Sequence, residues 1–231
     1  FFNIKPLNYY VSQINNGNWV NVYNFFSDKI LWPRGFPLEE IKQNKKYKIK
    51  KKLLICPINQ RLVDKNPDFD AVYRLTGNIP INFKKNKDIA LGKNSWCTFN
   101  SQNTIWFSKA FPLLYLPSYS SFRMSDIWRS LIAQRICWEN NWNILFSNST
   151  AIHERNDHNL LEDFKDEIPG YLNNANIAES LKDLKLKKGE QNLCSNLYKC
   201  YQLLCKKKLI NKAELKLLNC WIKDLKKIQN K

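Results

Sequence analysis

Three short segments combine charged side chains with Pro, Gly and aromatic residues. An arginine presents a rigid fork of hydrogen-bond donors that suits bidentate contact with a phosphate. A carboxylate can bind a divalent cation or accept a proton from a hydroxyl group. The chain therefore contains side chains able to bind a phosphorylated ligand and to act on a hydroxyl. The segments are WPRGFPLEE at 32–40, NPDFDAVYRLT at 66–76 and SFRMSDIWRSLIAQR at 121–135.

The first segment predicts an arginine held in a constrained turn. Arg34 lies between Pro33, which restricts the backbone, and Gly35, which lets another group approach closely. Such a turn could hold the guanidinium against an oxyanion. Alternatively, the turn is purely structural and Arg34 pairs with Asp28 or Glu39.

The second segment contains a pair of carboxylates, Asp68 and Asp70. If this segment is extended, both side chains lie on the same face, because alternate residues of a strand share a face. Two converging carboxylates could bind Mn or Mg, which prefer oxygen ligands. A single D-x-D is common in unrelated proteins, however, and Asp68 could instead stabilise a turn after Pro67.

The third segment begins the most regular helical pattern in the chain, with Asp126 in its first turn. Unpaired backbone amides at a helix N-terminus favour an ionised carboxylate, so Asp126 is the predicted catalytic base. An aspartate there is equally an ordinary helix-stabilising residue. Arg123 is a nearby candidate for binding substrate. Trp128 could present an aromatic platform to a sugar ring, although a tryptophan in the core is the alternative.

The chain has two histidines, His153 and His158, both within AIHERNDHNLLEDF. Their separation of five would not place them on one helix face, so the H-E-x-x-H pattern of zinc proteases is excluded. The loop resembles the C-terminal segment that glycosyltransferases of the GT-A fold close over a metal and a diphosphate. This resemblance implies that one histidine supplies an imidazole ligand to the metal and that Arg155 and Asn156 contact the phosphate or sugar. Solvated loop histidines are the alternative interpretation.

The composition indicates a folded, strongly basic protein. The 231 residues include 13% aromatics and carry a formal net charge of +17, and such a chain can bury a full core. The charge indicates a polyanionic partner, or it reflects an abundance of Lys and Asn throughout the chain. Seven cysteines without a C-x-x-C spacing exclude a structural zinc site. No nucleic-acid-binding signature is present, so nucleic acid is not an expected partner.

The sequence changes character near residue 175. Up to residue 171, short apolar runs alternate with Pro, Gly and Asn and indicate short strands and loops, interrupted by one helix from about Ser125. Residues 176–231 are Lys-rich and periodic, which predicts two or three amphipathic helices. Their charged face is either simply solvated or a surface for lipid head groups or a protein partner.

The order of these motifs resembles the STELLO-like glycosyltransferases and, more distantly, the UDP-arabinopyranose mutases, over about residues 19–171. The resemblance implies an α/β fold. We therefore expect residues 1–175 to be the C-terminal portion of a GT-A-like nucleotide-sugar transferase domain, with a mixed sheet and flanking helices, and residues 176–231 to be a basic helical extension. It also implies that the acidic metal-binding motif lies before WPRGFP, upstream of Phe1.

The resemblance assigns roles to several of these residues. Arg34 and Asp68 would contact the substrate, and Asp70 would contact the sugar or the acceptor as a second catalytic residue. Asn103 and Thr104 in SQNTIWF match a family signature whose side chains line the donor sugar. The implied cofactor is a divalent cation, Mn or Mg, with its main acidic ligands upstream.

The leading hypothesis is a metal-dependent enzyme that transfers a sugar from a nucleotide-sugar donor to a hydroxyl acceptor. The alternative is a catalytically inactive relative that binds a protein or membrane through residues 176–231. The expected location is the Golgi in a eukaryote, with an anchor upstream of Phe1, and otherwise the cytoplasm.

Overall fold

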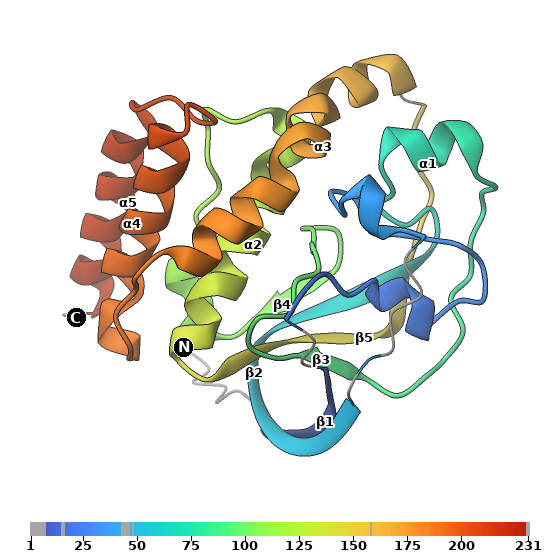
Figure 1. Ribbon diagram of the computed structural model, residues 1–231, viewed down its shortest axis with the longest axis horizontal. Coiled ribbons are helices and arrows are strands. Elements are labelled where there is room, and N and C mark those ends of the chain that lie inside the picture. Colours follow the sequence, from blue (N-terminus) through green and yellow to red (C-terminus); the bar gives the residue numbers. More distant parts are fainter. Residues whose placement is uncertain (1–7, 15–16, 43–46, 48, 158, 230–231) are drawn as a thin grey trace.

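A five-stranded mixed sheet lies against a layer of helices (Figure 1). The computed structural model describes residues 8–14, 17–42, 47, 49–157 and 159–229. The spatial strand order is β1-β3-β5-β2-β4, with a further pairing of β1 to β2. This architecture confirms the predicted α/β class and is consistent with a partial GT-A-like fold. The strands are β1 (Asn8–Ile14), β2 (Ile49–Lys65), β3 (Ile89–Leu91), β4 (Thr104–Trp106) and β5 (Trp142–His153).

The two longest strands, β2 and β5, run parallel and end at the same edge of the sheet. Their last paired residues are Lys65 and His153, so the segments that follow, 66–70 and 154–157, begin side by side. In open α/β sheets, ligands bind beyond the carboxyl ends of the strands. The strand pairing therefore brings two of the predicted motif segments to the expected edge.

Helix α2 (Ser125–Glu139) confirms the helix predicted from Ser125. Its residues Ile127, Leu131, Ile132 and Ile136 are fully buried, as their spacing predicts. The polar side chains between them are buried as well, including Ser130 and Gln134. The reason is that α2 packs against β5 on one side and against α3 (Leu160–Asp183) and α4 (Leu193–Lys206) on the other. A helix covered on all sides holds its N-terminus in a fixed position.

The longest helix, α3 (Leu160–Asp183), was not predicted from the sequence. The side chain of Asn159 caps its N-terminus by accepting hydrogen bonds from the amides of Leu161 and Glu162. The helix runs through the predicted division at residues 175 and 176. One hydrophobic core also spans both sides of that division, from Ile14 to Leu218. The division into two domains stays a prediction.

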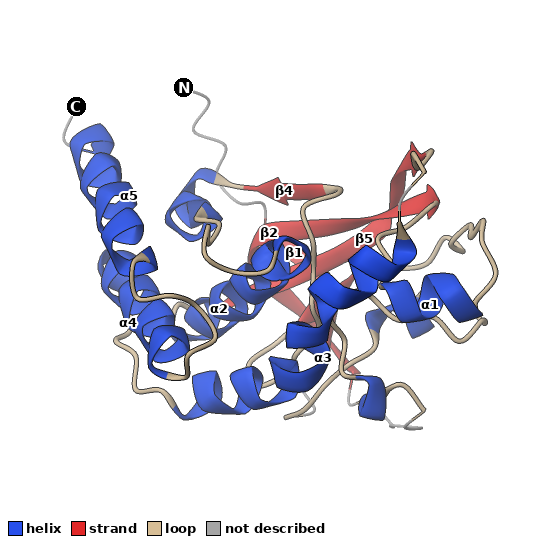
Figure 2. Ribbon diagram, turned by 90° about the horizontal axis from the view of Figure 1, so that it is seen from above, coloured by secondary structure: helices blue, strands red, loops and turns tan. Residues whose placement is uncertain are grey.

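Two further helices, α4 (Leu193–Lys206) and α5 (Glu214–Gln229), confirm the predicted amphipathic segments. They lie side by side at one end of the molecule, away from α1 (Ala71–Thr76) (Figures 1 and 2). Glu214 is buried and accepts hydrogen bonds from the Tyr115 hydroxyl and, at 2.7 Å, from the Tyr119 amide. The indole nitrogen of Trp221 donates to the Pro112 carbonyl at 3.1 Å. Helix α5 is thus fixed to the segment before α2.

Short 3-10 helices connect these elements, and no helix of the described residues is long and apolar enough to cross a membrane. All seven cysteines are free, as expected for residues that mostly serve as small hydrophobic side chains. The 3-10 helices are η1 (Val22–Phe25), η2 (Leu38–Glu40), η3 (Ser108–Leu114), η4 (Phe122–Met124) and η5 (Glu190–Asn192).

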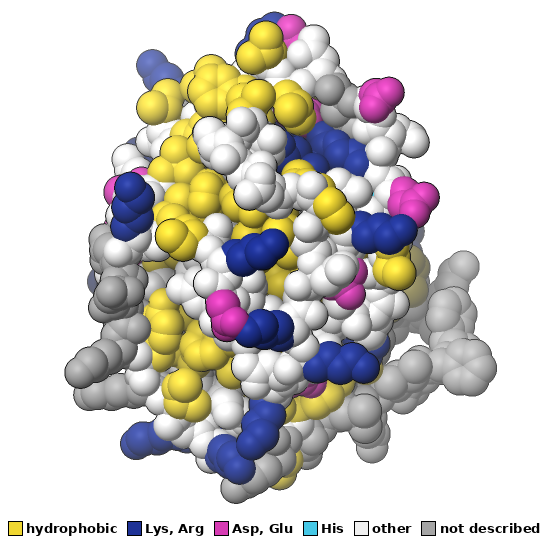
Figure 3. All heavy atoms as spheres, turned by 90° about the vertical axis from the view of Figure 1, so that its right-hand side faces the viewer, with side chains coloured by type: hydrophobic (Ala, Val, Ile, Leu, Met, Phe, Trp, Pro, Cys, Tyr) yellow, Lys and Arg dark blue, Asp and Glu magenta, His cyan; other side chains and the backbone are white. Residues whose placement is uncertain are grey.

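The end of the molecule that carries α1, opposite α4 and α5, shows a band of hydrophobic side chains with Lys and Arg spread around it (Figure 3).

Candidate functional site

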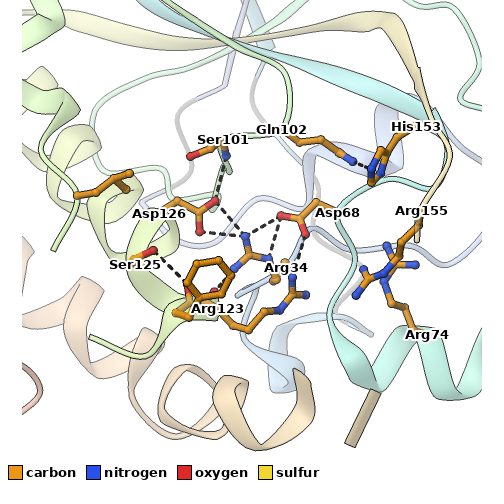
Figure 4. A pocket seen from close by; sticks show the side chains of 12 residues that line it. Arg34, Asp68, Arg74, Ser101, Gln102, Arg123, Ser125, Asp126, His153 and Arg155 are labelled. Atoms are coloured by element: carbon orange, nitrogen blue, oxygen red, sulfur yellow. Dashed lines mark hydrogen bonds and ion pairs between the residues drawn. The ribbon is translucent and has the colours of Figure 1, made fainter. Parts of the chain in front are cut away.

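A cavity of about 420 Å³ lies where the segments after β2 and β5 meet the N-terminus of α2 (Figure 4). Its volume is in the usual range for small-molecule sites. Four arginines and two carboxylates contribute to its wall, so the cavity is strongly charged. The lining residues are Arg34, Asp68, Arg74, Ser101, Gln102, Leu116, Phe122, Arg123, Ser125, Asp126, His153 and Arg155.

Arg34 lies between the two carboxylates of the cavity (Figure 4). Its Nε donates to Asp68 at 2.9 Å, and its Nη2 lies 2.8 Å from the same carboxylate. Nη2 also donates to both oxygens of Asp126, at 2.9 and 3.0 Å, and Nη1 donates to the Arg123 carbonyl. Asp126 accepts a further hydrogen bond from the Ser101 amide at 3.0 Å.

These contacts change the predicted role of Arg34. Only 5% of the residue is exposed, and all three of its nitrogens donate within the protein. Burial alone would raise the pKa of Asp68, but the Arg34 charge and hydrogen bond outweigh it and hold that pKa below its ordinary value. Arg34 therefore positions Asp68 and Asp126 and keeps Asp68 ionised. The alternative prediction, that Arg34 forms an ion pair within the protein, is correct, but its partners are Asp68 and Asp126. Asp28 pairs with Lys84 instead.

The turn that carries Arg34 is fixed by α2 and α3. The Asn174 amide of α3 donates to the Gly35 carbonyl at 2.7 Å and accepts from the indole nitrogen of Trp128 at 2.9 Å. The Thr98 hydroxyl donates to the Arg34 carbonyl at 2.7 Å. Trp128 is only 1% exposed, so its predicted role as a sugar platform is wrong. It stabilises the turn instead.

Replacing Gly35 with Ala is expected to destabilise the protein by about 2–4 kcal/mol, because the strain of a left-handed backbone adds to a steric clash of the new Cβ. Gly35 has a φ of +79°, and an added Cβ would lie 2.4 Å from Cγ2 of Ile127. Urea denaturation of the variant measures the loss. Gly17→Ala is a matched control, since Gly17 has a φ of +73° but no heavy atom within 4 Å of the added Cβ. Equal losses in the two variants would contradict the predicted clash with Ile127.

The structure corrects the prediction for Asp70, whose side chain does not reach the cavity. Asp70 is fully buried, caps α1 by accepting from the Tyr73 amide at 2.8 Å, and accepts from the indole nitrogen of Trp32 at 2.6 Å. The two carboxylates of the D-x-D therefore do not converge: Asp68 lines the cavity, whereas Asp70 stabilises the helix and the WPRGFP segment. Contact of Asp70 with a sugar or acceptor is not compatible with this burial.

The burial of Asp70 predicts a pH dependence of stability. Burial raises the pKa of Asp70 from 3.8 to about 6, despite the hydrogen bonds from Tyr73 and Trp32. Between these pH values the folded state binds more protons than the unfolded state. The contribution of Asp70 to the free energy of unfolding is therefore at its maximum below about pH 4 and is lost as the pH rises through about 6. This loss should be on the order of 3 kcal/mol.

Asp70→Asn should remove that decline. The free energy of unfolding of the variant, relative to the unmodified protein, should therefore increase between about pH 4 and about pH 7, as measured by urea denaturation at each pH. Asp224→Asn, in the exposed part of α5, serves as the control. A constant difference across this range would contradict the role assigned to the buried carboxyl.

The opposite wall of the cavity is cationic. Arg123 donates from Nε and Nη2 to Glu167 of α3, at 2.9 and 2.6 Å, and Arg155 donates to Asp163 of the same helix. Arg74 donates to two backbone carbonyls and lies beside Arg155 (Figure 4). Arg123 and Arg155 were predicted to bind substrate, and both line the cavity. Arg74 lines it as well but was not predicted to do so.

The two residues of SQNTIWF predicted to bind substrate, Asn103 and Thr104, lie outside the cavity lining. Asn103 donates to the Leu62 carbonyl at 3.1 Å, and the Thr104 hydroxyl lies 2.5 Å from the Asn100 carbonyl. Both contacts connect segments around the sheet. Their neighbours Ser101 and Gln102 line the cavity instead, so this motif reaches the site through a different pair of residues than the one predicted.

The histidine loop reaches the cavity through His153 and Arg155. Nδ1 of His153 lies 2.8 Å from the Gln102 amide nitrogen. Asn156 is exposed and does not line the cavity, and His158 lies outside the described residues. No group of three or more His, Cys, Asp or Glu side chains able to hold a metal occurs in the described part of the chain. By themselves, these residues do not fit a divalent cation, and the metal-ligand role of His153 stays a prediction.

Several lining residues could not be identified from their types alone. Leu116 and Phe122 form an apolar side of the cavity, and Phe122 is 85% exposed. Ser125 lies next to Asp126 at the start of α2. Phe122 and Ser125 both belong to the SFRMSDIW motif, so proximity to Asp126 was the available signal. Leu116 lies in no motif.

Comparison with known proteins gives a match to the C-terminal half of the chain, which includes α2 and the lining residues from Arg123 onward. Residues 123–231 match the family model of the STELLO glycosyltransferases. Two Arabidopsis thaliana proteins, "Probable glycosyltransferase STELLO2" and "Probable glycosyltransferase STELLO1", are 31% and 30% identical over 143 residues, which cover 58% of this chain. These alignments span 19% and 18% of the two relatives. The chain is thus similar to the STELLO glycosyltransferases, which confirms the resemblance inferred from the motifs, and the family-model match extends through α4 and α5.

Proposed function

We propose that this chain forms the acceptor side of a nucleotide-sugar-dependent glycosyltransferase site, together with the loop that contacts the donor diphosphate. The observation that carries the proposal is the cavity itself. It combines a pair of carboxylates with a cluster of arginines, contributed by four of the motif segments. A nucleotide sugar has a diphosphate that arginines can bind, and its transfer requires a base for the incoming hydroxyl.

In this proposal Asp126 is the base. Its Oδ1 accepts a hydrogen bond from Arg34, and its Oδ2 accepts from Arg34 and from the Ser101 amide, so Oδ1 has the greater remaining capacity for a proton. The acceptor oxygen bonds to the anomeric carbon, and its proton moves to Asp126. The bond from that carbon to the diphosphate oxygen breaks, and its electron pair leaves with the diphosphate.

Phe122 takes the role first assigned to Trp128. Its ring is 85% exposed beside the carboxylate pair, and an exposed aromatic ring can pack against the apolar face of a sugar. Leu116 extends this apolar surface. The cavity is therefore divided into an apolar side, for a sugar or acceptor, and a cationic side, for phosphate.

A divalent cation, Mn or Mg, belongs to the proposal only as a group held mainly by ligands other than the described residues. Such an ion would offset the negative charge of the departing diphosphate. Among the residues that the structure describes, His153 is the imidazole that could be added to such a site. No step assigned here to Asp126 or to the arginines depends on the ion.

Titration with a panel of UDP- and GDP-sugars, each with and without Mn, tests the proposed function. Isothermal titration calorimetry should detect saturable binding of at least one nucleotide sugar by the folded protein. A folded protein that binds none of them would favour the scaffold hypothesis. The location proposed with the enzyme is the Golgi.

One observation favours the scaffold as a second candidate. A groove beside α4 and α5 has five lysines around an apolar floor that includes Leu184, Leu203 and Leu215. Residues 184–231 contain thirteen lysines and three acidic residues. An anionic membrane surface matches this combination. The scaffold hypothesis predicts sedimentation with vesicles of phosphatidylserine and phosphatidylcholine, and no sedimentation with phosphatidylcholine alone. The lysines of the groove are Lys185, Lys199, Lys206, Lys208 and Lys212.

A further inference from the structure

Arg74 and Arg155 form an unusual pair of like charges at one end of the cavity (Figure 4). Arg74 comes from α1, and Arg155 comes from the segment after β5. Burial and the neighbouring charge of Arg155 lower the pKa of Arg74 to about 10. Two guanidinium groups held together in this way concentrate positive charge that an anion would neutralise.

The fixed contacts of the pair leave donors available to a ligand. Arg74 donates from Nε to the Phe69 carbonyl at 3.3 Å and from Nη2 to the Pro67 carbonyl at 2.6 Å, which uses two of its five N–H groups. Arg155 is held by Asp163 of α3 through Nη2. Among the described residues, Arg74 has no carboxylate within ion-pair distance. The guanidinium is therefore positioned, but its charge is not locally paired.

The carboxylates of the cavity are not arranged to bind a metal ion. Asp68 and Asp126 both direct oxygens at Arg34, which occupies the point where a metal shared by the two would lie. His153 is the one imidazole in the described lining. The charges that face the free end of the cavity are therefore those of guanidinium groups.

We propose that Arg74 and Arg155 bind the diphosphate of the nucleotide-sugar donor directly, without a divalent cation between them. This inference rests on the glycosyltransferase function proposed above and specifies how that site recognises its donor. Two guanidinium groups can each give bidentate hydrogen bonds to phosphate oxygens. They would also stabilise the charge that develops on the diphosphate as the sugar departs.

The test is the binding of UDP and GDP alone, measured by isothermal titration calorimetry in EDTA and in Mn. The unmodified protein should bind one of them with similar affinity in both buffers. Arg74→Gln and Arg155→Gln should each weaken this binding by about ten- to a hundredfold, the range for a lost charged hydrogen bond. Arg74→Lys should recover only part, because it restores charge without the fork.

Arg61→Gln is the matched control, since it makes the same change on β2 outside the cavity lining. Circular dichroism melting identifies any variant that fails to fold, and Arg155→Gln and Arg74→Lys provide independent readouts if Arg74→Gln is unstable. Binding that requires Mn, or that survives the substitutions, would overturn the direct-contact inference and leave the glycosyltransferase proposal standing. A folded protein that binds neither nucleotide nor any nucleotide sugar in either buffer would overturn both.

Discussion

Asp126→Asn should reduce sugar transfer by at least about a hundredfold while leaving nucleotide-sugar binding nearly unchanged. The substitution keeps the size of the side chain and one hydrogen-bond acceptor for Arg34, but it removes the group that accepts the proton. Loss of a general base typically costs two to four orders of magnitude in rate, about 10²–10⁴. The measurement is single-turnover transfer from the nucleotide sugar that binds best in the panel, beside calorimetric binding of the same donor.

Asp68→Asn separates catalysis from the structural role of the ion pairs. Asp68 and Asp126 both contact Arg34, and their side chains are equally exposed, at 12%. If Asp126 acts only by holding Arg34, the two variants should lose transfer to a similar degree. The proposal requires a much larger loss of rate for Asp126→Asn, and full activity in that variant would remove Asp126 as the base.

Arg34→Met should destabilise the protein by about 3–5 kcal/mol, the usual cost of removing one partner from a buried ion pair. Methionine preserves much of the side-chain volume, but it leaves Asp68 and Asp126 largely buried without their shared counter-charge. Because the pKa of Asp68 lies below its ordinary value of 3.8 in the folded protein, its contribution is present above about pH 4 and is lost as the pH falls. The difference between the two proteins should therefore shrink in acid.

The triple variant Arg34→Met, Asp68→Asn, Asp126→Asn is the control for this explanation. Removal of both carboxylate charges should recover a large part of the stability that Arg34→Met alone loses, in urea denaturation at neutral pH. If the triple variant is less stable than Arg34→Met, unpaired charge is not the cause of the loss.

The motifs correctly predicted that distant segments come together in one site. They were less accurate about the role of each side chain. Arg34, Asp68 and Asp126 converge on one cavity, as motifs from a shared site should. Asp70 was misplaced because the face-sharing argument assumed an extended segment, whereas α1 begins at Ala71 and Asp70 becomes its cap. The same turn of the chain directs Arg74 into the cavity, and no local pattern indicates that direction.

Helix α3 was missed because Pro, Gly and Asn residues up to residue 171, which include Pro169 and Gly170, were interpreted as a sign of short strands and loops. The structure shows why the glycine is needed inside a helix: an added Cβ would lie 2.1 Å from the Met124 sulfur. This close approach places Glu167 where it accepts from Arg123 and from the Ala71 amide. Such a requirement comes from a residue 46 positions away in sequence, so local propensity cannot reveal it.

The buried Glu214 gives α5 a part in the shape of the cavity. It holds Tyr115 and Tyr119, which lie on either side of Leu116 and precede Phe122, the apolar wall of the site. A shortened protein ending before residue 214 would retain every lining residue but would release the anchor of that wall. The smallest unit that keeps the cavity intact is therefore longer than the list of lining residues suggests, and an expression boundary placed near residue 176 would remove the support of the apolar wall.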